Sequence, residues 1–100
     1  MKLRAHNAKR DANEKEIVGI LERLGFSVFR LDKPLDLLLG RGGKNYLAEV
    51  KDGSKAPSAG KNRRTEDQKT FMRDWRGQHV VLSSVEETVE WVNSLREAGL

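Results

Sequence analysis

The sequence predicts a single α/β domain with a mixed sheet, whose elements follow one another in the order αβββαβα. Three observations carry this prediction. Apolar residues recur at helical spacing in three segments, and four short apolar runs bounded by turn-forming residues lie between them. A chain of 100 residues is also long enough for one core but not for two. We therefore expect residues 1–100 to form one domain.

The first helix is expected over residues 11–25, with Gly25 as its natural stop. Its apolar residues fall at positions i, i+3, i+4 and i+7, namely Ile17, Ile20, Leu21 and Leu24. The segment from Asp11 to Glu14 resembles a capping box with Asp as the N-cap, which would commit Glu14 to the start of the helix. Glu16 lies at the edge of the apolar stripe, where the residues alone favour an ordinary solvated glutamate.

A strand over residues 26–31 is expected to lead into a β-hairpin. The two hairpin strands, residues 35–39 and 46–50, are short apolar runs separated by turn-forming residues. Three consecutive strands joined by short turns make an antiparallel meander.

The glycines of the hairpin turn determine its pairing register. If Gly42 and Gly43 are the central residues of a two-residue turn, a position where positive φ favours glycine, the pairs follow by counting outward. This register predicts that Arg41 faces Lys44 and that Asp36 faces Glu49.

Alternation of side chains along the hairpin separates an apolar face from a charged face. The apolar face must belong to the core and comprises Leu35, Leu37, Leu39, Tyr46, Ala48 and Val50. The other face comprises Asp36, Leu38, Leu47, Glu49 and Lys51. Two facing carboxylates destabilise a sheet unless a cation lies between them or one of them is protonated. A one-residue bulge would move Asp36 off this face.

Asp36 and Glu49 offer hard oxygen ligands that suit Mg²⁺, which needs only one or two carboxylates when phosphate and water complete its shell. Lys51 adds a compact positive charge on the same face. Together these groups indicate phosphodiester hydrolysis, in which the metal polarises phosphate and water while the lysine steadies developing charge or the attacking water. The alternative is a solvated face on which Glu49 and Lys51 merely pair with neighbours. The register and the clean apolar face favour a site.

Residues 52–64 lack periodicity and are expected to form a functional or disordered loop. Its cations are Lys55, Lys61, Arg63 and Arg64. We expect them to contact the phosphates of a nucleic acid, although a solvated basic linker is an equally good interpretation. The net charge of the chain is +4, and the charged residues are unevenly distributed. Residues 51–76 hold eight Lys or Arg and four Asp or Glu, whereas residues 85–100 hold one Arg and four Glu. This asymmetry suggests that a polyanionic substrate approaches one side.

The second helix is expected to begin at Thr65 with a capping box and to end at Gly77. One face of this helix, expected to point toward the sheet, carries Gln68, Phe71, Met72 and Trp75. Gln68 is either only a cap or a contact to the scissile phosphate. Phe71 and Trp75 are expected in the core rather than as base-stacking surfaces.

The chain is expected to end with a strand over residues 78–83 and a last helix. This helix begins with a capping box from Ser84 to Glu87 and ends near Gly99. Its expected buried stripe is Val85, Val89, Val92 and Leu95.

The composition excludes several kinds of site. No cysteine is present, which excludes disulfides and thiolate metal sites, and His6 and His79 lack ligand-spaced partners, which argues against zinc. No apolar run is long enough for a membrane span, and the polar N-terminal segment offers no signal peptide. We therefore expect a soluble intracellular protein without a membrane partner.

Several short motifs follow one another along the chain, and their order and spacing are more specific than any one of them alone. They are Glu14-Lys15-Glu16-Ile17-Val18, Gly25-Phe26, Asp36-Leu37-Leu38-Leu39-Gly40, Tyr46-Leu47-Ala48-Glu49-Val50-Lys51 and Thr65-Glu66-Asp67-Gln68-Lys69. Nearly the whole chain resembles the PD-(D/E)xK nucleases, which implies a restriction-endonuclease-like αβββαβ core with a C-terminal helix. It most resembles the stand-alone virus-type replication-repair nucleases (VRR-NUC) and is similar to archaeal Holliday junction resolvases.

The resemblance implies roles for individual residues. The family's helix-one glutamate corresponds to Glu16, its metal-binding carboxylates to Asp36 and Glu49, its lysine to Lys51 and its helix glutamine to Gln68. The carbonyl of Val50 is a further candidate metal ligand, and Lys69 joins the candidate DNA-binding cations. The family usually has Pro immediately before the Asp, whereas here Leu35 separates Pro34 from Asp36.

The resemblance also implies an activity. It predicts a Mg²⁺- or Mn²⁺-dependent endonuclease of phage or prophage origin, acting in the cytoplasm of a bacterial host without a nucleotide cofactor. Stand-alone members are similar to junction resolvases, which form homodimers and cut branched DNA, especially four-way junctions. A dimer suits a two-fold symmetric junction, because two equivalent nicks need two sites. The alternatives are a sequence-specific or single-strand nuclease of the same fold, and a non-catalytic nucleic-acid-binding module.

Overall fold

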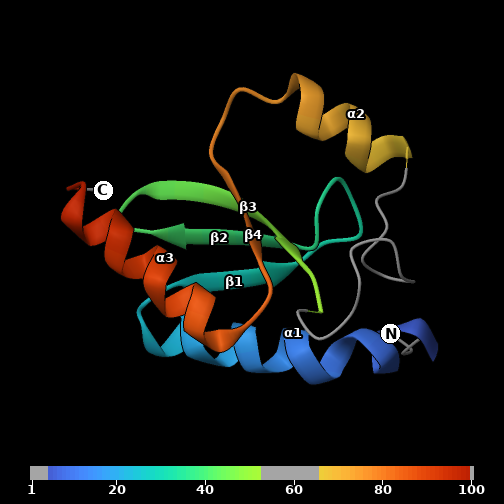
Figure 1. The fold of residues 1–100 in the computed structure, drawn as a ribbon, viewed down its shortest axis with the longest axis horizontal. Helices are drawn as coiled ribbons and strands as arrows, with labels where there is room; N and C mark the ends of the chain where they lie inside the picture. Colours follow the sequence, from blue (N-terminus) through green and yellow to red (C-terminus); the bar gives the residue numbers. More distant parts are fainter. Residues whose placement is uncertain (1–4, 53–65, 100) are drawn as a thin grey trace.

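The computed structural model describes residues 5–52 and 66–99, with side chains described from residue 12 onward. The elements are α1 (Ala5–Arg23), β1 (Ser27–Arg30), β2 (Leu37–Arg41), β3 (Lys44–Val50), α2 (Glu66–Asp74), β4 (His79–Leu82) and α3 (Val85–Glu97). Their order confirms the predicted αβββαβα arrangement (Figure 1).

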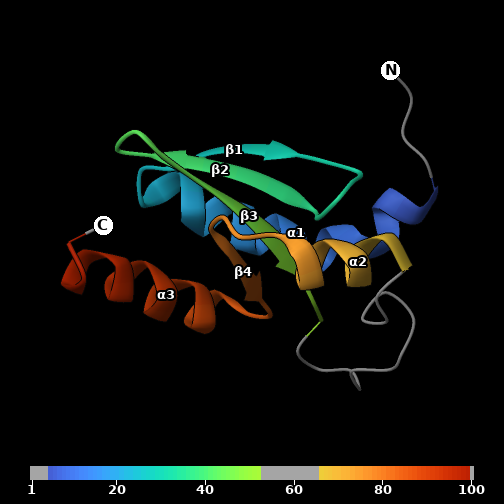
Figure 2. The same ribbon diagram turned by 90° about the horizontal axis from the view of Figure 1, so that it is seen from above.

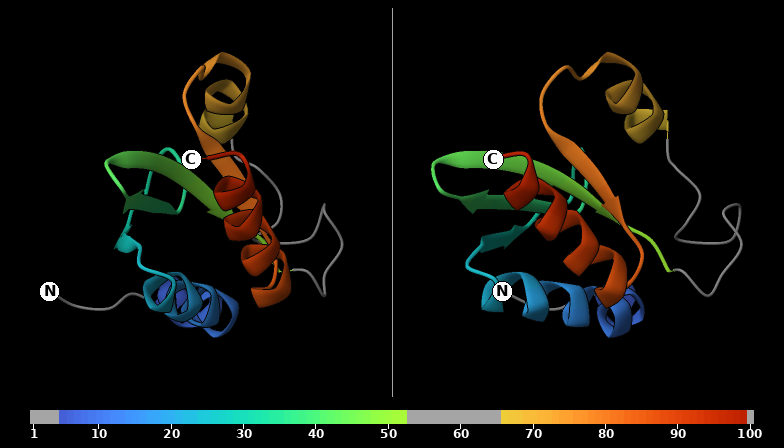
Figure 3. Two further views of the ribbon diagram at one scale, coloured as in Figure 1. Left: turned by 90° about the vertical axis from the view of Figure 1, so that its left-hand side faces the viewer. Right: turned by 60° about the vertical axis from the view of Figure 1, so that its left-hand side comes forward.

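The four strands form one mixed sheet in the spatial order β1-β2-β3-β4 (Figure 2). The first three strands are antiparallel, as predicted, and β4 runs parallel to β3. The sheet arches over α1 and α3, while α2 lies outside this core on the far side of the sheet from α1 (Figure 3). The core therefore lies on one face of the sheet, and the other face is left for the predicted charged residues.

The first helix begins earlier than predicted. It starts at Ala5, so Asp11 lies inside the helix and the predicted capping box is wrong. The capping pattern predicted the wrong start of the helix, because the residues before Asp11 include Ala, Lys and Arg, which are good helix formers and extend the helix. The buried face of α1 consists of Glu14, Ile17, Val18 and Leu21. Glu14 is therefore a core-facing residue and not a cap.

The hairpin turn and most of its register are as predicted. Gly42 and Gly43 have φ of 62° and 79°, and Arg41 pairs with Lys44. All six residues of the predicted apolar face are buried: Leu35, Leu37, Leu39, Tyr46, Ala48 and Val50. Positive φ at both central positions is the geometry of a type I′ turn, which matches the twist of the flanking strands.

The predicted pairing of Asp36 with Glu49 is wrong. Regular pairing ends where Leu37 faces Ala48, yet the backbone N–H of Asp36 also donates to the Ala48 carbonyl, at 3.0 Å. Two consecutive residues thus face one, which is the pattern of a β-bulge. The bulge takes Asp36 out of the regular ladder just before β2 begins.

Two glycine substitutions are expected to change stability in opposite directions. Gly43→Ala places a side chain at φ 79° and should lower the free energy of unfolding by about 1–2 kcal/mol. Gly19→Ala should raise it by about 0.5–1 kcal/mol, because a Cβ at this helical position meets no atom within 4 Å. Urea unfolding measures the free energy of unfolding of both variants. If Gly43→Ala raised it as Gly19→Ala does, the assignment of Gly43 to the turn would be contradicted.

The helix α2 departs most from expectation. All of its residues are described, and it buries no side chain, so the prediction that Phe71 and Trp75 belong to the core is wrong. Their rings stack on each other, with centroids 5.2 Å apart, and Trp75 is 41% exposed. The amphipathic spacing was real, but α1 and α3 already cover the core face of the sheet. The predicted cap at Thr65 lies outside the described residues.

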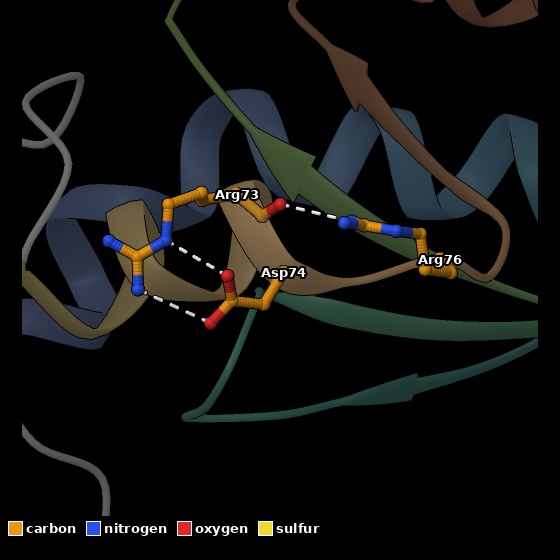
Figure 4. Close-up of polar contacts among 3 residues, drawn as sticks. All are labelled: Arg73, Asp74 and Arg76. Carbon is orange, nitrogen blue, oxygen red and sulfur yellow. Dashed lines mark hydrogen bonds and ion pairs between the residues drawn. The ribbon is translucent and has the colours of Figure 1, made fainter.

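Polar contacts hold the end of α2 (Figure 4). The Arg76 guanidinium donates to the Arg73 carbonyl at 3.0 Å, which satisfies a carbonyl at the helix C-terminus. Arg73 also donates to both carboxylate oxygens of Asp74, at 2.9 and 3.3 Å. This hydrogen bond lowers the pKa of Asp74 and raises the pKa of Arg73. Both side chains are exposed, so the pair contributes little to stability.

The last helix begins as predicted. The Ser84 hydroxyl accepts a hydrogen bond from the Glu87 N–H at 3.0 Å, and the Glu87 carboxylate accepts one from the Ser83 N–H at 2.6 Å. The helix ends before Gly99, whose φ is 77°. Its buried residues are Thr88, Val92 and Leu95, while Val85 and Val89 are only partly buried. In the described part of the chain no helix has the length and apolar character that crossing a membrane requires.

Candidate active site

The centre of the candidate site is an ion pair at the end of β3. The Lys51 ammonium lies 2.7 Å from the Glu49 carboxylate, and their side chains are 15% and 2% exposed. Alternation along β3 directs Glu49 away from the core face that Ala48 and Val50 occupy. The alternative in the sequence analysis was a solvated Glu49–Lys51 pair. The observed pair is instead buried, and a buried ion pair carries a desolvation cost that an exposed pair does not.

Asp36 is held beside this pair by three hydrogen bonds. Its carboxylate accepts the Val50 N–H at 2.7 Å, and its backbone bonds to Ala48 and to the Leu31 N–H, the latter at 2.7 Å. The bulge that broke the predicted pairing thus gives the carboxylate a fixed partner on β3. Asp36 and the Glu49–Lys51 pair are joined through a single residue, Val50.

The backbone of Val50 also faces Asp36. The N–H and C=O of a strand residue point to the same side, so the Val50 carbonyl faces the side on which β2 has not yet begun. The predicted ligand carbonyl therefore lies next to the Asp36 carboxylate along one edge of the sheet.

This edge lies where a parallel pair of strands ends. The Lys51 N–H donates to the Leu82 carbonyl at 2.9 Å, immediately after the last β3–β4 pair. Ligands of α/β proteins commonly bind in the crevice outside the carboxyl ends of parallel strands. Asp36, which bonds to Val50, and the Glu49–Lys51 pair on either side of Val50 lie at this end of the strands.

Searches against protein-family models, curated proteins and solved structures found no match.

Two glutamates of α1, Glu14 and Glu16, differ in their exposure to solvent. Glu16 is exposed, whereas Glu14 is 1% exposed and accepts a hydrogen bond from Arg30 Nε at 2.8 Å. Arg30 pairs with Leu37, next to Asp36, so Glu14 reaches the same end of the sheet from the face that α1 covers. Sequence reasoning missed Glu14, although its positions three before Ile17 and seven before Leu21 place it on the buried stripe. The catalytic role of Glu16 stays a prediction.

The remaining candidate residues lie on α2 or outside the described residues. Gln68 is partly buried on α2, and exposed Lys69 lies 3.6 Å from the Glu66 carboxylate. The four candidate DNA-binding cations Lys55, Lys61, Arg63 and Arg64 lie outside the described residues.

The donor set at the edge fits a hard divalent cation. Asp36, Glu49 and the Val50 carbonyl supply only oxygen, which suits Mg²⁺ or Mn²⁺. Among the side chains that the structure describes, residues 12–52 and 66–99, no group of three or more His, Cys, Asp or Glu gathers as a metal site. Mg²⁺ needs only one or two protein carboxylates when substrate phosphate and water complete its shell, so two carboxylates and a carbonyl suffice.

Proposed function

We propose that the protein is a metal-dependent DNA endonuclease that hydrolyses phosphodiester bonds and selects branched DNA such as four-way junctions. The observation that carries this proposal is the buried Glu49–Lys51 pair, which lies beside a second carboxylate, Asp36, at the carboxyl end of β3. A buried ion pair is seldom a net source of stability compared with apolar residues of similar volume. Its place at a strand end is better explained by chemistry.

Each residue of the edge has a role in this proposal. Asp36 and Glu49 would hold Mg²⁺ or Mn²⁺, with the Val50 carbonyl as a further ligand. The bound ion would polarise the phosphate and lower the pKa of a water molecule. The Val50 N–H fixes the orientation of the Asp36 carboxylate, at 2.7 Å. Lys51 orients Glu49 and supplies a positive charge for the negative charge that develops on the phosphate.

Nucleic acid as substrate is supported by the distribution of charge. Residues 51–76, which begin at the site, carry a twofold excess of basic over acidic residues. Selectivity for branched DNA, a homodimeric assembly and a phage or prophage origin rest on the nuclease resemblance. A dimer would supply two equivalent nicks to a two-fold symmetric junction.

Cleavage of matched DNA substrates tests this function. The purified protein is incubated with a labelled four-way junction, its matched linear duplex and a single strand, each with Mg²⁺ and with EDTA. Paired symmetric nicks on the junction alone, dependent on metal, are the expected result. Metal-dependent cutting of every substrate would keep the nuclease and remove junction selectivity. Salt-sensitive binding without any cutting would instead favour a nucleic-acid-binding module.

Mg²⁺ is expected to stabilise the folded protein through the same edge. At a concentration about a hundred times its Kd, a ligand that binds only the folded state adds about 2.7 kcal/mol to the free energy of unfolding. Glu49→Gln should lose this effect, whereas Glu86→Gln, at an exposed position of α3, should keep it. Thermal unfolding with Mg²⁺ and with EDTA measures the difference. Equal stabilisation of both variants would place the ion elsewhere.

A further inference from the structure

A single side chain of α1 joins the ends of the two parallel strands. The amide nitrogen of Asn13, Nδ2, donates to the Lys51 carbonyl at 2.5 Å and to the Ser83 carbonyl at 3.1 Å. These carbonyls follow β3 and β4 directly, at the edge that carries the candidate site. Asn13 therefore bridges three elements that are far apart in the sequence.

The regular ladder stops at this point. The last β3–β4 pair joins Val50 to Leu82, and the Lys51 N–H to the Leu82 carbonyl is the next hydrogen bond. Beyond it the Asn13 amide, which has two N–H donors, takes the place of further ladder hydrogen bonds. The backbone of Lys51 is thus held at two atoms, by the Leu82 carbonyl at its N–H and by the Asn13 amide at its carbonyl.

We propose that Asn13 is a positioning residue that fixes the Lys51 backbone and thereby holds the Lys51 ammonium against Glu49. Asn13 donates to two backbone carbonyls, of Lys51 and Ser83, and not to a side chain of the site, so it acts on the site by holding the backbone of Lys51. The side chain of Lys51 is long and flexible, and its position depends on where the backbone of this strand end is held. The consequence for catalysis rests on the proposed function, whereas the positioning of Lys51 does not.

The amide is suited to this bridge in a way that close analogues are not. Asn13→Asp has nearly the same shape but replaces both N–H donors by an oxygen, which repels the two carbonyls. Asn13→Ser retains one donor, and Asn13→Ala retains none. The expected order of loss is therefore Asp, then Ala, then Ser. Asn93→Ala, at an exposed position of α3, is the matched control.

Amide hydrogen exchange measured by NMR tests the positioning directly. The Lys51 N–H, bonded to the Leu82 carbonyl, should exchange about tenfold faster in Asn13→Ala than in the wild type. The Leu47 N–H, bonded to the Gln78 carbonyl at 3.2 Å, lies at the other end of the same ladder and should be unchanged. Unchanged exchange at Lys51, or equal acceleration at Leu47, would overturn the proposal. If Asn13→Asp does not fold, Asn13→Ser and Asn13→Ala still decide it.

The kinetics of cleavage test the consequence for the reaction. Asn13→Ala should lower kcat by about tenfold and leave KM within about twofold, because a displaced Lys51 affects the reacting phosphate more than binding of the DNA. A rise in KM alone, or wild-type kinetics, would overturn the catalytic consequence. A wild-type protein that cuts no DNA would remove the proposed function, while hydrogen exchange would still decide whether Asn13 positions Lys51.

Discussion

Exchange of Lys51 for methionine is expected to lower the rate of metal-dependent cleavage by about a thousandfold, the loss typical of removing one group that stabilises transition-state charge. It should also lower the free energy of unfolding by roughly 3 kcal/mol, because the 2% exposed Glu49 carboxylate loses its ion-pair partner 2.7 Å away. Rate assays on the four-way junction and urea unfolding measure the two effects.

A double variant separates these two effects. Lys51→Met combined with Glu49→Gln removes the buried negative charge and should recover most of the lost stability, since the remaining pair is uncharged. Cleavage should stay as low as in Lys51→Met, because both proposed catalytic groups are then absent. A stable double variant that cuts DNA at the wild-type rate would contradict the assignment of Glu49 and Lys51 to the site.

Glu14→Gln is expected to lower the free energy of unfolding by about 1–3 kcal/mol, whereas Glu16→Gln should change it by less than about 0.5 kcal/mol. The carboxylate of Glu14 is buried and bonded to Arg30 Nε at 2.8 Å, while Glu16 is exposed. Because Arg30 lies beside the segment that carries Asp36, we also expect Glu14→Gln to reduce cleavage at least tenfold. Parallel unfolding and cleavage assays of the two variants make the comparison.

The outcome decides which glutamate of α1 belongs to the site. Wild-type cleavage by Glu14→Gln together with a large loss in Glu16→Gln would restore the residue that the nuclease resemblance indicated. Loss of stability without loss of cleavage in Glu14→Gln would make the Glu14–Arg30 pair purely structural.

The hairpin shows how far sequence reasoning reached. Two adjacent glycines determine the turn, and a period of two then predicts both faces and the position of Glu49 beside Lys51. The position of Asp36 was not predicted, because the bulge depends on hydrogen bonds that its backbone makes to two other parts of the chain. Its N–H bonds to Ala48 of β3, and its carbonyl bonds to Leu31, which follows β1. An alternating pattern carries no signal for that.

The helices show a second limit. A capping pattern does not say whether the preceding residues also form helix, so the start of α1 was missed and Glu14 was assigned to a cap. Asn13 carries no local signal either, because its partners on Lys51 and Ser83 are brought to it only by the fold. An amphipathic face, as on α2, shows which side would be buried but not whether another element is there to cover it.

That uncovered helix has a practical meaning for experiments. Because α2 buries no side chain, the cooperative unfolding of the domain is governed by the sheet, α1 and α3. Substitutions at exposed Lys69 will therefore leave the melting of the domain almost untouched. A change in cleavage or DNA affinity in such variants can be interpreted directly as a change in function, without correction for the fraction of protein that is folded.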